Sequence, residues 1–153
     1  MIIKLAISLL IPQFAGGLGA LVTTPNIPTW FATLHKPFFS PPNWLFAPVW
    51  TLLFLLMGLS FYLIWLKKKN LGHGIFKWYW VQLILNMFWS FLFFGFQSPF
   101  LALLEIFVLW FAIFQTIKSF SKVNQTAGLL LYPYLAWVSF ATILNAAIFW
   151  LNR

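Results

Sequence analysis

The sequence predicts an all-α integral membrane protein, a bundle of five transmembrane helices with a proline-rich loop between the first two. Of the 153 residues, 63% are hydrophobic and only 7% are charged, whereas a soluble domain carries about a quarter charged residues. A chain with so few charges cannot cover a water-exposed surface. It also holds several apolar stretches close to the roughly 20 residues that a helix needs to cross a bilayer.

The composition excludes several classes of function. The chain has no cysteine, so disulfides and thiolate metal sites are excluded. The net charge of +8 comes from nine cations against one acid and not from a dense basic face, so nucleic acid is not an expected partner. The lipid bilayer is therefore the first partner that the composition predicts.

Five segments are long and apolar enough to be spans within a single domain, residues 1–153. They are Ile2–Thr23, Asn43–Leu66, Ile75–Gln97, Pro99–Ile117 and Ala127–Leu151. The first resembles a secretory signal, but it is longer than the usual hydrophobic region of about 7–15 residues. We interpret it as a retained span, with cleavage near Gly19 and Ala20 as the alternative.

Local signals support the boundaries between the spans. Ser98 and Pro99 are typical of a helix start, with Ser as N-cap and Pro at the first helical position, so the third and fourth spans form a tight hairpin. The only long connection is Thr24–Pro42. Its prolines restrict the backbone, so we expect a semi-rigid lid.

The distribution of lysine and arginine predicts the orientation of the chain. In a five-span arrangement only Lys36 and Arg153 fall on the C-terminal side. The other cations fall on the N-terminal side: Lys4, Lys67, Lys68, Lys69, Lys77, Lys118 and Lys122. We expect the N-terminus in the cytoplasm and the C-terminus outside, and the lysine asymmetry favours a plasma membrane over an outer membrane.

The ten tryptophans fall into groups by their depth in the spans. An interfacial belt is the expected role for those near span ends, Trp65, Trp78, Trp80 and Trp150. Another group lies one to three turns inside the spans, where an indole N–H needs a partner: Trp50, Trp89, Trp110 and Trp137. For this group a belt, simple packing and a ligand site remain open.

Three spans carry a face that mixes large aromatics with small or polar residues. At helical spacing, these faces are Trp50, Phe54, Met57, Gly58 and Phe61 on the second span, Gln82, Asn86, Trp89 and Phe93 on the third, and Trp137, Ala141 and Asn145 on the fifth. Lipid does not favour amides, so these faces should turn inward. They predict either hydrogen bonds between helices of a tight bundle or an aromatic cavity with a few polar groups.

The spans also contain an acid, two prolines and a pair of small residues. Glu105, the only acid, lies about two turns into the fourth span, where it is either a neutral, hydrogen-bonded carboxyl or a proton-coupled group. Pro48 and Pro133 are expected to kink their helices. Gly16 and Ala20 form a small-xxx-small pair that predicts close packing, within the bundle or between subunits.

Ordered motifs along nearly the whole chain resemble the translocator protein / tryptophan-rich sensory protein (TspO/MBR) family, here a bacterial member. In the first half they are Trp30-Phe31, Lys36-Pro37-Phe38, Pro41-Pro42, Trp44, Phe46, Pro48-Val49-Trp50-Thr51 and Met57-Gly58. In the second half they are Gln82-Leu83, Leu85-Asn86, Trp89-Ser90, Pro133-Tyr134, Trp137, Phe140-Ala141-Thr142 and Leu144-Asn145.

The resemblance implies a five-helix bundle, often dimeric, with a pocket lined mainly by the second, third and fifth helices and capped by the first long loop. The implied ligand-binding residues are Trp30, Phe31, Pro41, Pro42, Trp50, Phe54, Asn86, Trp89, Trp137, Ala141 and Leu144. The implied ligands are porphyrins such as protoporphyrin IX, and synthetic benzodiazepine-type and isoquinoline compounds. Light-dependent porphyrin breakdown would place Trp50 and Trp137 in a catalytic role.

The resemblance implies a function in porphyrin regulation or stress sensing, with transport of porphyrin or another small hydrophobic ligand as the alternative. Whether the chain is an enzyme stays open. The sequence has no acid–base pair, nucleophile constellation or metal site, so any chemistry would come from excited porphyrin, oxygen and indoles. No cofactor is required, and no metal is expected. A porphyrin would be a ligand, metal-free and bound by stacking, because the spans offer no obvious haem-ligating side chain within the aromatic faces.

This chain departs from the family pattern at two places. Phe31 stands where some members have Tyr, so one hydroxyl contact is missing. The tail from Leu144 to Arg153 lacks the Tyr of the animal cholesterol motif, so specific cholesterol recognition is not expected. At the pocket mouth, His35 and Lys36 are either solvated loop residues or contacts to a ligand carboxylate.

Overall fold

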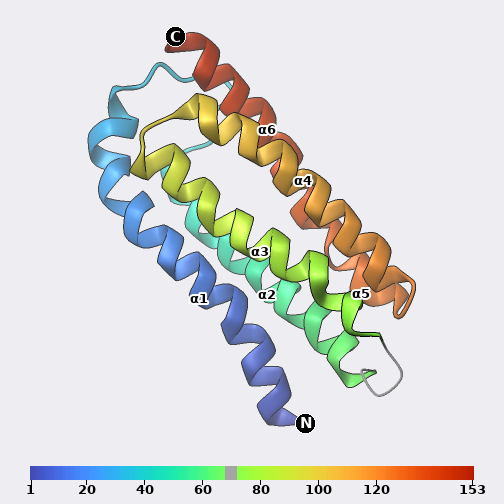
Figure 1. The fold of residues 1–153 in the computed structure, drawn as a ribbon. Helices are drawn as coiled ribbons and strands as arrows, with labels where there is room; N and C mark the ends of the chain where they lie inside the picture. The colour runs from blue at the N-terminus through green and yellow to red at the C-terminus, as the bar shows by residue number, and fades with distance from the viewer. Residues whose placement is uncertain (68–71) are drawn as a thin grey trace.

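The computed structural model describes residues 1–67 and 72–153, and no strand occurs among them (Figure 1). Its α-helices are α1 (Ile2–Asn26), α2 (Phe46–Leu66), α3 (Lys77–Ser90), α4 (Pro99–Ser121), α5 (Gln125–Leu129) and α6 (Tyr132–Leu151). Within the described residues, 4 helical segments are long and apolar enough to cross a membrane: Ile2–Phe31, Asn43–Leu66, Pro99–Ser121 and Gln125–Leu151. The predicted all-α membrane class is confirmed at this level.

The third expected span, residues 75–97, is not among these four. Its α-helical part, α3, has only 14 residues. A 3₁₀ turn, η4 (His73–Phe76), precedes it, and a π-helical turn, η5 (Phe91–Gly95), follows it. Helical backbone therefore continues from 73 to 95, and it packs against α1 and α4. A fifth membrane crossing stays a prediction.

The prediction of a long loop at Thr24–Pro42 is wrong for its first residues, because the first helix continues beyond Thr23. α1 runs to Asn26, and the π-helical turn η1 (Ile27–Phe31) extends it. Membrane helices tolerate proline where side chains and local π adjustments satisfy the freed backbone groups. Here the Asn26 side-chain amide donates to the Val22 carbonyl at 2.8 Å and the Thr29 hydroxyl donates to the Pro25 carbonyl at 2.9 Å.

The connection that remains is short and is fastened to the end of α6. The Asn152 side chain accepts a hydrogen bond from the His35 backbone N–H at 2.9 Å and donates to the His35 carbonyl, also at 2.9 Å. The Phe39 and Phe140 ring centroids lie 6.3 Å apart. The segment then enters the 3₁₀ turn η2 (Asn43–Leu45), which leads directly into α2.

One expected helix boundary is confirmed and several others shift. The predicted Ser98 cap is confirmed, since its hydroxyl accepts from the Leu101 N–H at 3.3 Å. α4 continues beyond Ile117 to Ser121, and the last span begins with the separate helix α5. Pro48 and Pro133 do not kink a helix interior as expected. Pro133 is the second residue of α6, where the missing N–H has no intrahelical partner to lose, and Pro48 is the third residue of α2.

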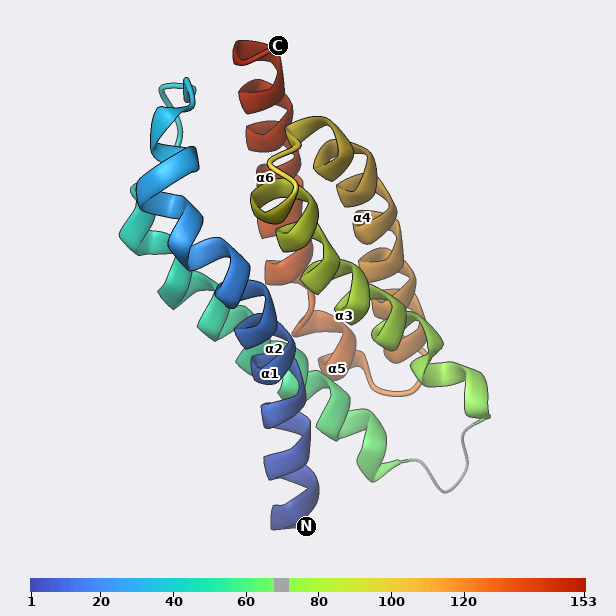
Figure 2. The same ribbon diagram turned by 60° about the vertical axis from the view of Figure 1, so that its left-hand side comes forward.

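Glycines bring α1 against its neighbours inside the bundle. A Cβ at Gly58 would lie 2.6 Å from the Ser8 carbonyl oxygen, and one at Gly16 would overlap the Phe54 ring. A Cβ at Gly19 would lie 3.0 Å from Ser90 Oγ. The small-residue face of α1 therefore serves packing within the bundle. Figure 2 shows α1 crossing α2 on one side of the molecule, with α4 and α6 on the other.

Candidate functional site

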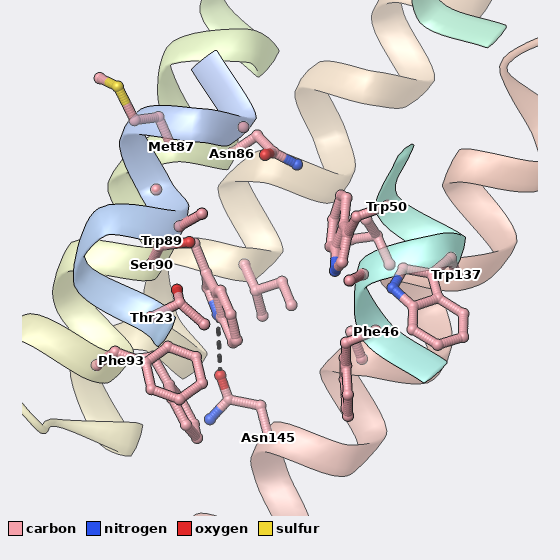
Figure 3. A pocket seen from close by; sticks show the side chains of 18 of the residues that line it. Thr23, Phe46, Trp50, Asn86, Met87, Trp89, Ser90, Phe93, Trp137 and Asn145 are labelled. Atoms are coloured by element: carbon pink, nitrogen blue, oxygen red, sulfur yellow. Dashed lines mark hydrogen bonds between the residues drawn. The ribbon is translucent and has the colours of Figure 1, made fainter. Parts of the chain in front are cut away.

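A cavity of about 240 Å³ lies inside the bundle and draws its lining from α1, η1, η2, α2, α3, η5, α4 and α6. We call it the tryptophan cavity, because Trp50, Trp89 and Trp137 all line it (Figure 3). Its walls are mostly apolar. Part of its lining is exposed, namely Ala20 and Thr24 on α1 and Asn43 and Ala47 beside and on α2. The cavity therefore reaches the outside between these two helices.

Most of the residues implied by the resemblance line this cavity. They are Phe31, Trp50, Phe54, Asn86, Trp89, Trp137, Ala141 and Leu144. Pro41 and Pro42 do not line it, because Asn43 and Phe46, which follow them, take the places at its rim.

Trp30 also lies outside the cavity lining. In the helical extension of α1, Phe31 belongs to the lining and Trp30 does not. The Trp30 ring packs edge-on against Phe93 and Phe94, at centroid distances of 5.5 and 6.3 Å, and so lies behind these two lining residues, which Phe31 also contacts.

Aromatic contacts hold two of the tryptophans at the boundary between α2 and α6. The Trp50 ring lies 5.5 Å from Phe54, one turn further along α2, and meets Tyr134 of α6 edge-on at 6.1 Å. Trp137 meets Phe46 of α2 edge-on, also at 6.1 Å. Among the described residues no hydrogen bond of the Trp50 or Trp137 indole N–H is found, and neither nitrogen is one of the buried polar atoms that lack a partner.

Two of the three amides of the predicted faces, Asn86 and Asn145, connect helices and border the cavity at once. The third, Gln82, lies outside the cavity lining and donates to Met57 Sδ at 3.9 Å. Trp89 Nε1 donates to Asn145 Oδ1 at 3.1 Å (Figure 3), and Asn145 Nδ2 donates to the Pro99 carbonyl at 2.8 Å. Asn86 Nδ2 donates to the Tyr134 hydroxyl at 2.8 Å. The two interpretations left open for these faces, a hydrogen-bond network and a cavity, therefore both apply.

Other lining residues escaped the sequence-based set. Asn145 was absent from the implied ligand-binding set, although helical spacing had already placed it on the face of Trp137 and Ala141. Phe46 lies one turn before Trp50, so helical spacing could have added it. The wall from α1, which includes Ala15, Gly16, Gly19 and Thr23, carried only a packing signal. α4 contributes Ile106 and Leu109, which no sequence feature distinguished from other apolar residues.

Two of the singled-out side chains lie elsewhere in the bundle. Trp110 Nε1 donates to Ser139 Oγ at 2.8 Å and so joins α4 to α6. Both carboxyl oxygens of Glu105 are buried without a hydrogen-bond partner in the described part of the chain. The expected hydrogen-bonded acid is therefore not what the structure shows, and Glu105 is absent from the cavity lining although Ile106 belongs to it.

Lys36, near the cavity, contacts residues of its own segment. Lys36 Nζ lies 4.6 Å from the centroid of the Phe31 ring and donates to the Leu34 carbonyl at 3.3 Å. Lys68 and Lys69, part of the predicted topology signal, lie outside the described residues. Among the residues that are described, no group of three His, Cys, Asp or Glu side chains could hold a metal ion.

Comparison with known sequences decides the family. The sequence model described as "TspO/MBR family" matches residues 8–151. The chain belongs to the TspO/MBR family. It is 42% identical over 151 residues to the "Tryptophan-rich protein TspO" of Archaeoglobus fulgidus, with 99% of this chain and 98% of that protein covered.

Similar proteins of the TspO/MBR family come from bacteria and animals. The chain is 44% identical over 144 residues to the "Tryptophan-rich protein TspO" of Chlorobaculum tepidum, covering 90% of this chain and 89% of that one. It is 39% identical over 143 residues to the "Translocator protein" of Bos taurus, covering 89% and 82%.

Proposed function

We propose that this TspO/MBR-family chain binds a flat, hydrophobic tetrapyrrole of the protoporphyrin IX type in the tryptophan cavity. One observation carries the proposal: Trp50, Trp89 and Trp137, from three different helices, line a single apolar cavity in a membrane protein. A flat apolar macrocycle stacks well on indole rings. The indole N–H groups of Trp50 and Trp137 supply directional contacts of the kind that small-molecule pockets use for orientation.

The size of the cavity bears on how such a ligand would enter. At about 240 Å³ it is slightly smaller than the roughly 300–1,000 Å³ of typical ligand pockets. A macrocycle therefore requires the walls to part. The exposed lining between α1 and α2 is the natural place for this, because Thr24 and Ala47 already connect the cavity with the outside there.

The proposal includes an arrangement in a bacterial plasma membrane. We place a third crossing at the continuous helical segment 73–95, which gives five spans. The lysine bias then puts the N-terminus in the cytoplasm, and the cavity rim near Asn43 on the outer side. Residues 32–42 act as a lid held by Asn152, and the chain forms a homodimer through lipid-exposed helix faces.

A second candidate activity is light-dependent breakdown of the bound porphyrin. It is supported by the position of Trp50 and Trp137 in the same cavity, with rings held by Tyr134 and Phe46. Excited porphyrin and molecular oxygen would be the reactants, and the indoles would take part in electron transfer. No acid–base machinery is needed for such a reaction.

A titration in the dark tests binding. Protoporphyrin IX is added to purified protein in detergent, and quenching of tryptophan fluorescence is followed for the wild type and for Trp50→Phe/Trp137→Phe. We expect saturable quenching whose Kd rises about tenfold or more in the double variant, a loss of about 1.4 kcal/mol. Trp110→Phe is the matched control, because this indole bonds to Ser139 outside the cavity.

The same samples are then illuminated. A new protein-bound product from the wild type, with little from the double variant or from porphyrin in empty micelles, supports the photochemical role. Equal bleaching in all samples rejects that role. An unchanged Kd in the double variant, with a normal unfolding midpoint, rejects the binding site itself.

A further inference from the structure

A second hollow lies at the other end of the bundle. It is a cleft of about 230 Å³ lined by Ile11 of α1, Phe61 and Trp65 of α2, Phe76 of η4 and Trp80 of α3. None of these residues lines the tryptophan cavity. In Figure 1 the ends of α1, α2 and α3 that supply this lining lie toward the N-terminus, at the opposite end from the C-terminus.

The cleft leads from the surface of the bundle to a buried aromatic floor. Trp80 is 41% exposed, whereas Phe61 is only 6% exposed. The Phe61 ring centroid lies 4.9 Å from Phe76, 5.7 Å from Trp65 and 5.7 Å from Trp80. All lining side chains are hydrocarbon or aromatic, and an unfilled apolar cleft loses dispersion contacts. A hydrocarbon chain is therefore the occupant that matches the walls.

One lysine stands at the mouth of this cleft and a second lies close by. Lys4 Nζ lies 5.6 Å from the centroid of the Trp65 ring, and Lys4 precedes Ile11 by two helical turns, roughly 10 Å along the axis. Lys77 precedes Trp80 by three residues on α3, and its Nζ lies 5.5 Å from the centroid of the neighbouring Trp78 ring. We call this hollow, with Lys4 and Lys77, the lysine-rimmed cleft.

The charge of the rim is not neutralised by the protein itself. The chain has one acidic residue in all, and that residue, Glu105, lies within α4. Lys67, a further cation at this end, donates instead to the Val123 carbonyl at 3.3 Å. An apolar cleft with ammonium groups above it is complementary to a molecule with a hydrocarbon chain below a negative head group, and basic residues near a membrane surface favour anionic lipids.

We propose that the lysine-rimmed cleft binds one anionic phospholipid of the surrounding leaflet. An acyl chain lies against Ile11 and Phe61, and the phosphate lies beside Lys4, where the Lys77 ammonium reaches it by leaving the Trp78 ring. The site is separate from the tryptophan cavity, and the proposal does not depend on what that cavity binds.

Photo-crosslinking tests the site. The protein is placed in phosphatidylcholine bilayers that contain a small fraction of phosphatidylglycerol with a diazirine in its acyl chain, and cross-linked peptides are identified by mass spectrometry. We expect adducts concentrated at Ile11, Phe61 and Trp80, and several-fold fewer with the same diazirine on phosphatidylcholine. Lys4→Gln/Lys77→Gln should lower the yield by roughly tenfold.

Two matched variants separate this site from general attraction. Lys118→Gln/Lys122→Gln removes the same charge from α4 and its C-cap and should leave the yield unchanged. Ile11→Trp fills the cleft and should abolish the adducts while both rim lysines remain. Equal yields for the two lipids, adducts spread over all helices, an equal loss in the α4 variant, or protein–protein adducts at the cleft would each overturn the proposal. Thermal unfolding confirms that each variant is folded.

Discussion

The tryptophan cavity and the lysine-rimmed cleft use similar aromatic residues with different polar groups. In the cavity the polar groups lie inside: Asn145 accepts from Trp89, and Asn86 donates to Tyr134. In the cleft the lining has no amide or hydroxyl, and the charges stand at the mouth. Buried hydrogen-bonding groups discriminate among ligand shapes, whereas an apolar cleft below lysines selects a class of lipid by charge. The difference suggests a selective site at one end and a lipid contact at the other.

The largest expected effect comes from a change that disturbs both hollows at once. Gly58→Val places a side chain where a Cβ already lies 2.6 Å from the Ser8 carbonyl oxygen and 2.8 Å from Leu9 Cα. We expect a loss of about 3 kcal/mol in unfolding free energy, because α1 supplies lining to both hollows. Thermal or denaturant unfolding in detergent measures it.

Gly17→Ala is the control for this change, since a Cβ at Gly17 meets nothing within 4 Å. It should be neutral or slightly stabilising, because alanine favours helix over glycine. Equal destabilisation by the two variants would show that close contact at Gly58 is not what holds α1 to α2.

A smaller effect, confined to the tryptophan cavity, is expected for Asn145→Leu. The change removes the acceptor of Trp89 Nε1 and the donor to the Pro99 carbonyl. We expect a cost of about 2 kcal/mol and weaker porphyrin binding, measured by unfolding and by fluorescence titration. Lipid cross-linking at the cleft should not change. A loss of both binding activities would contradict the independence of the two hollows.

At the cavity end, residues 32–42 are held to the end of α6 by the Asn152 side chain. Asn152→Ala removes both hydrogen bonds to the His35 backbone, each of which is worth about 1 kcal/mol. We expect faster amide hydrogen exchange in residues 33–40 and faster porphyrin release. Arg153→Gln, next in the chain, is the control and should leave exchange there unchanged. Unaltered exchange in Asn152→Ala would mean that other contacts hold the loop.

The smallest expected effect concerns Lys36. Its ammonium lies over the Phe31 ring, a contact worth roughly 0.5–1 kcal/mol at an exposed site. Lys36→Gln should therefore change the Kd for protoporphyrin IX by about fivefold or less in the fluorescence titration. A tenfold or larger increase in Kd, reduced by salt, would favour the alternative that Lys36 contacts a ligand carboxylate directly.

Helical spacing predicted the aromatic faces well, because each lies within one helix. Trp50 and Phe54 share a face of α2, and Trp137 and Ala141 share a face of α6, as their spacing indicates. The side of the first helix could not be predicted in the same way. Small residues such as Gly16 report close packing, but they do not say whether a helix, a cavity or lipid lies opposite.

The start of the first loop was predicted wrongly for a different reason. Pro25 and Pro28 are usual signs of a loop in water, but π-helical backbone and side-chain hydrogen bonds carry the helix past them here. In this continued helix Phe31 lines the cavity and Trp30 does not. The sequence did not predict the lysine-rimmed cleft, because Trp65 and Trp80 taken one at a time are typical of an interfacial belt. Only the fold brings the two rings together around Phe61.

The close contact at Gly58 is the natural pivot point for a tilt of α2 against α1, and it lies much nearer to one hollow than to the other. The backbones of α1 and α2 meet so closely there that a relative rotation has its centre near this point. Phe46 lies 12 residues away, roughly 18 Å along the helix, and Phe61 lies three residues away on the other side. A tilt of about 5° therefore moves Phe46 by about 1.5 Å and Phe61 by only about 0.4 Å, in opposite directions. Widening the tryptophan cavity in this way leaves the lysine-rimmed cleft almost unchanged.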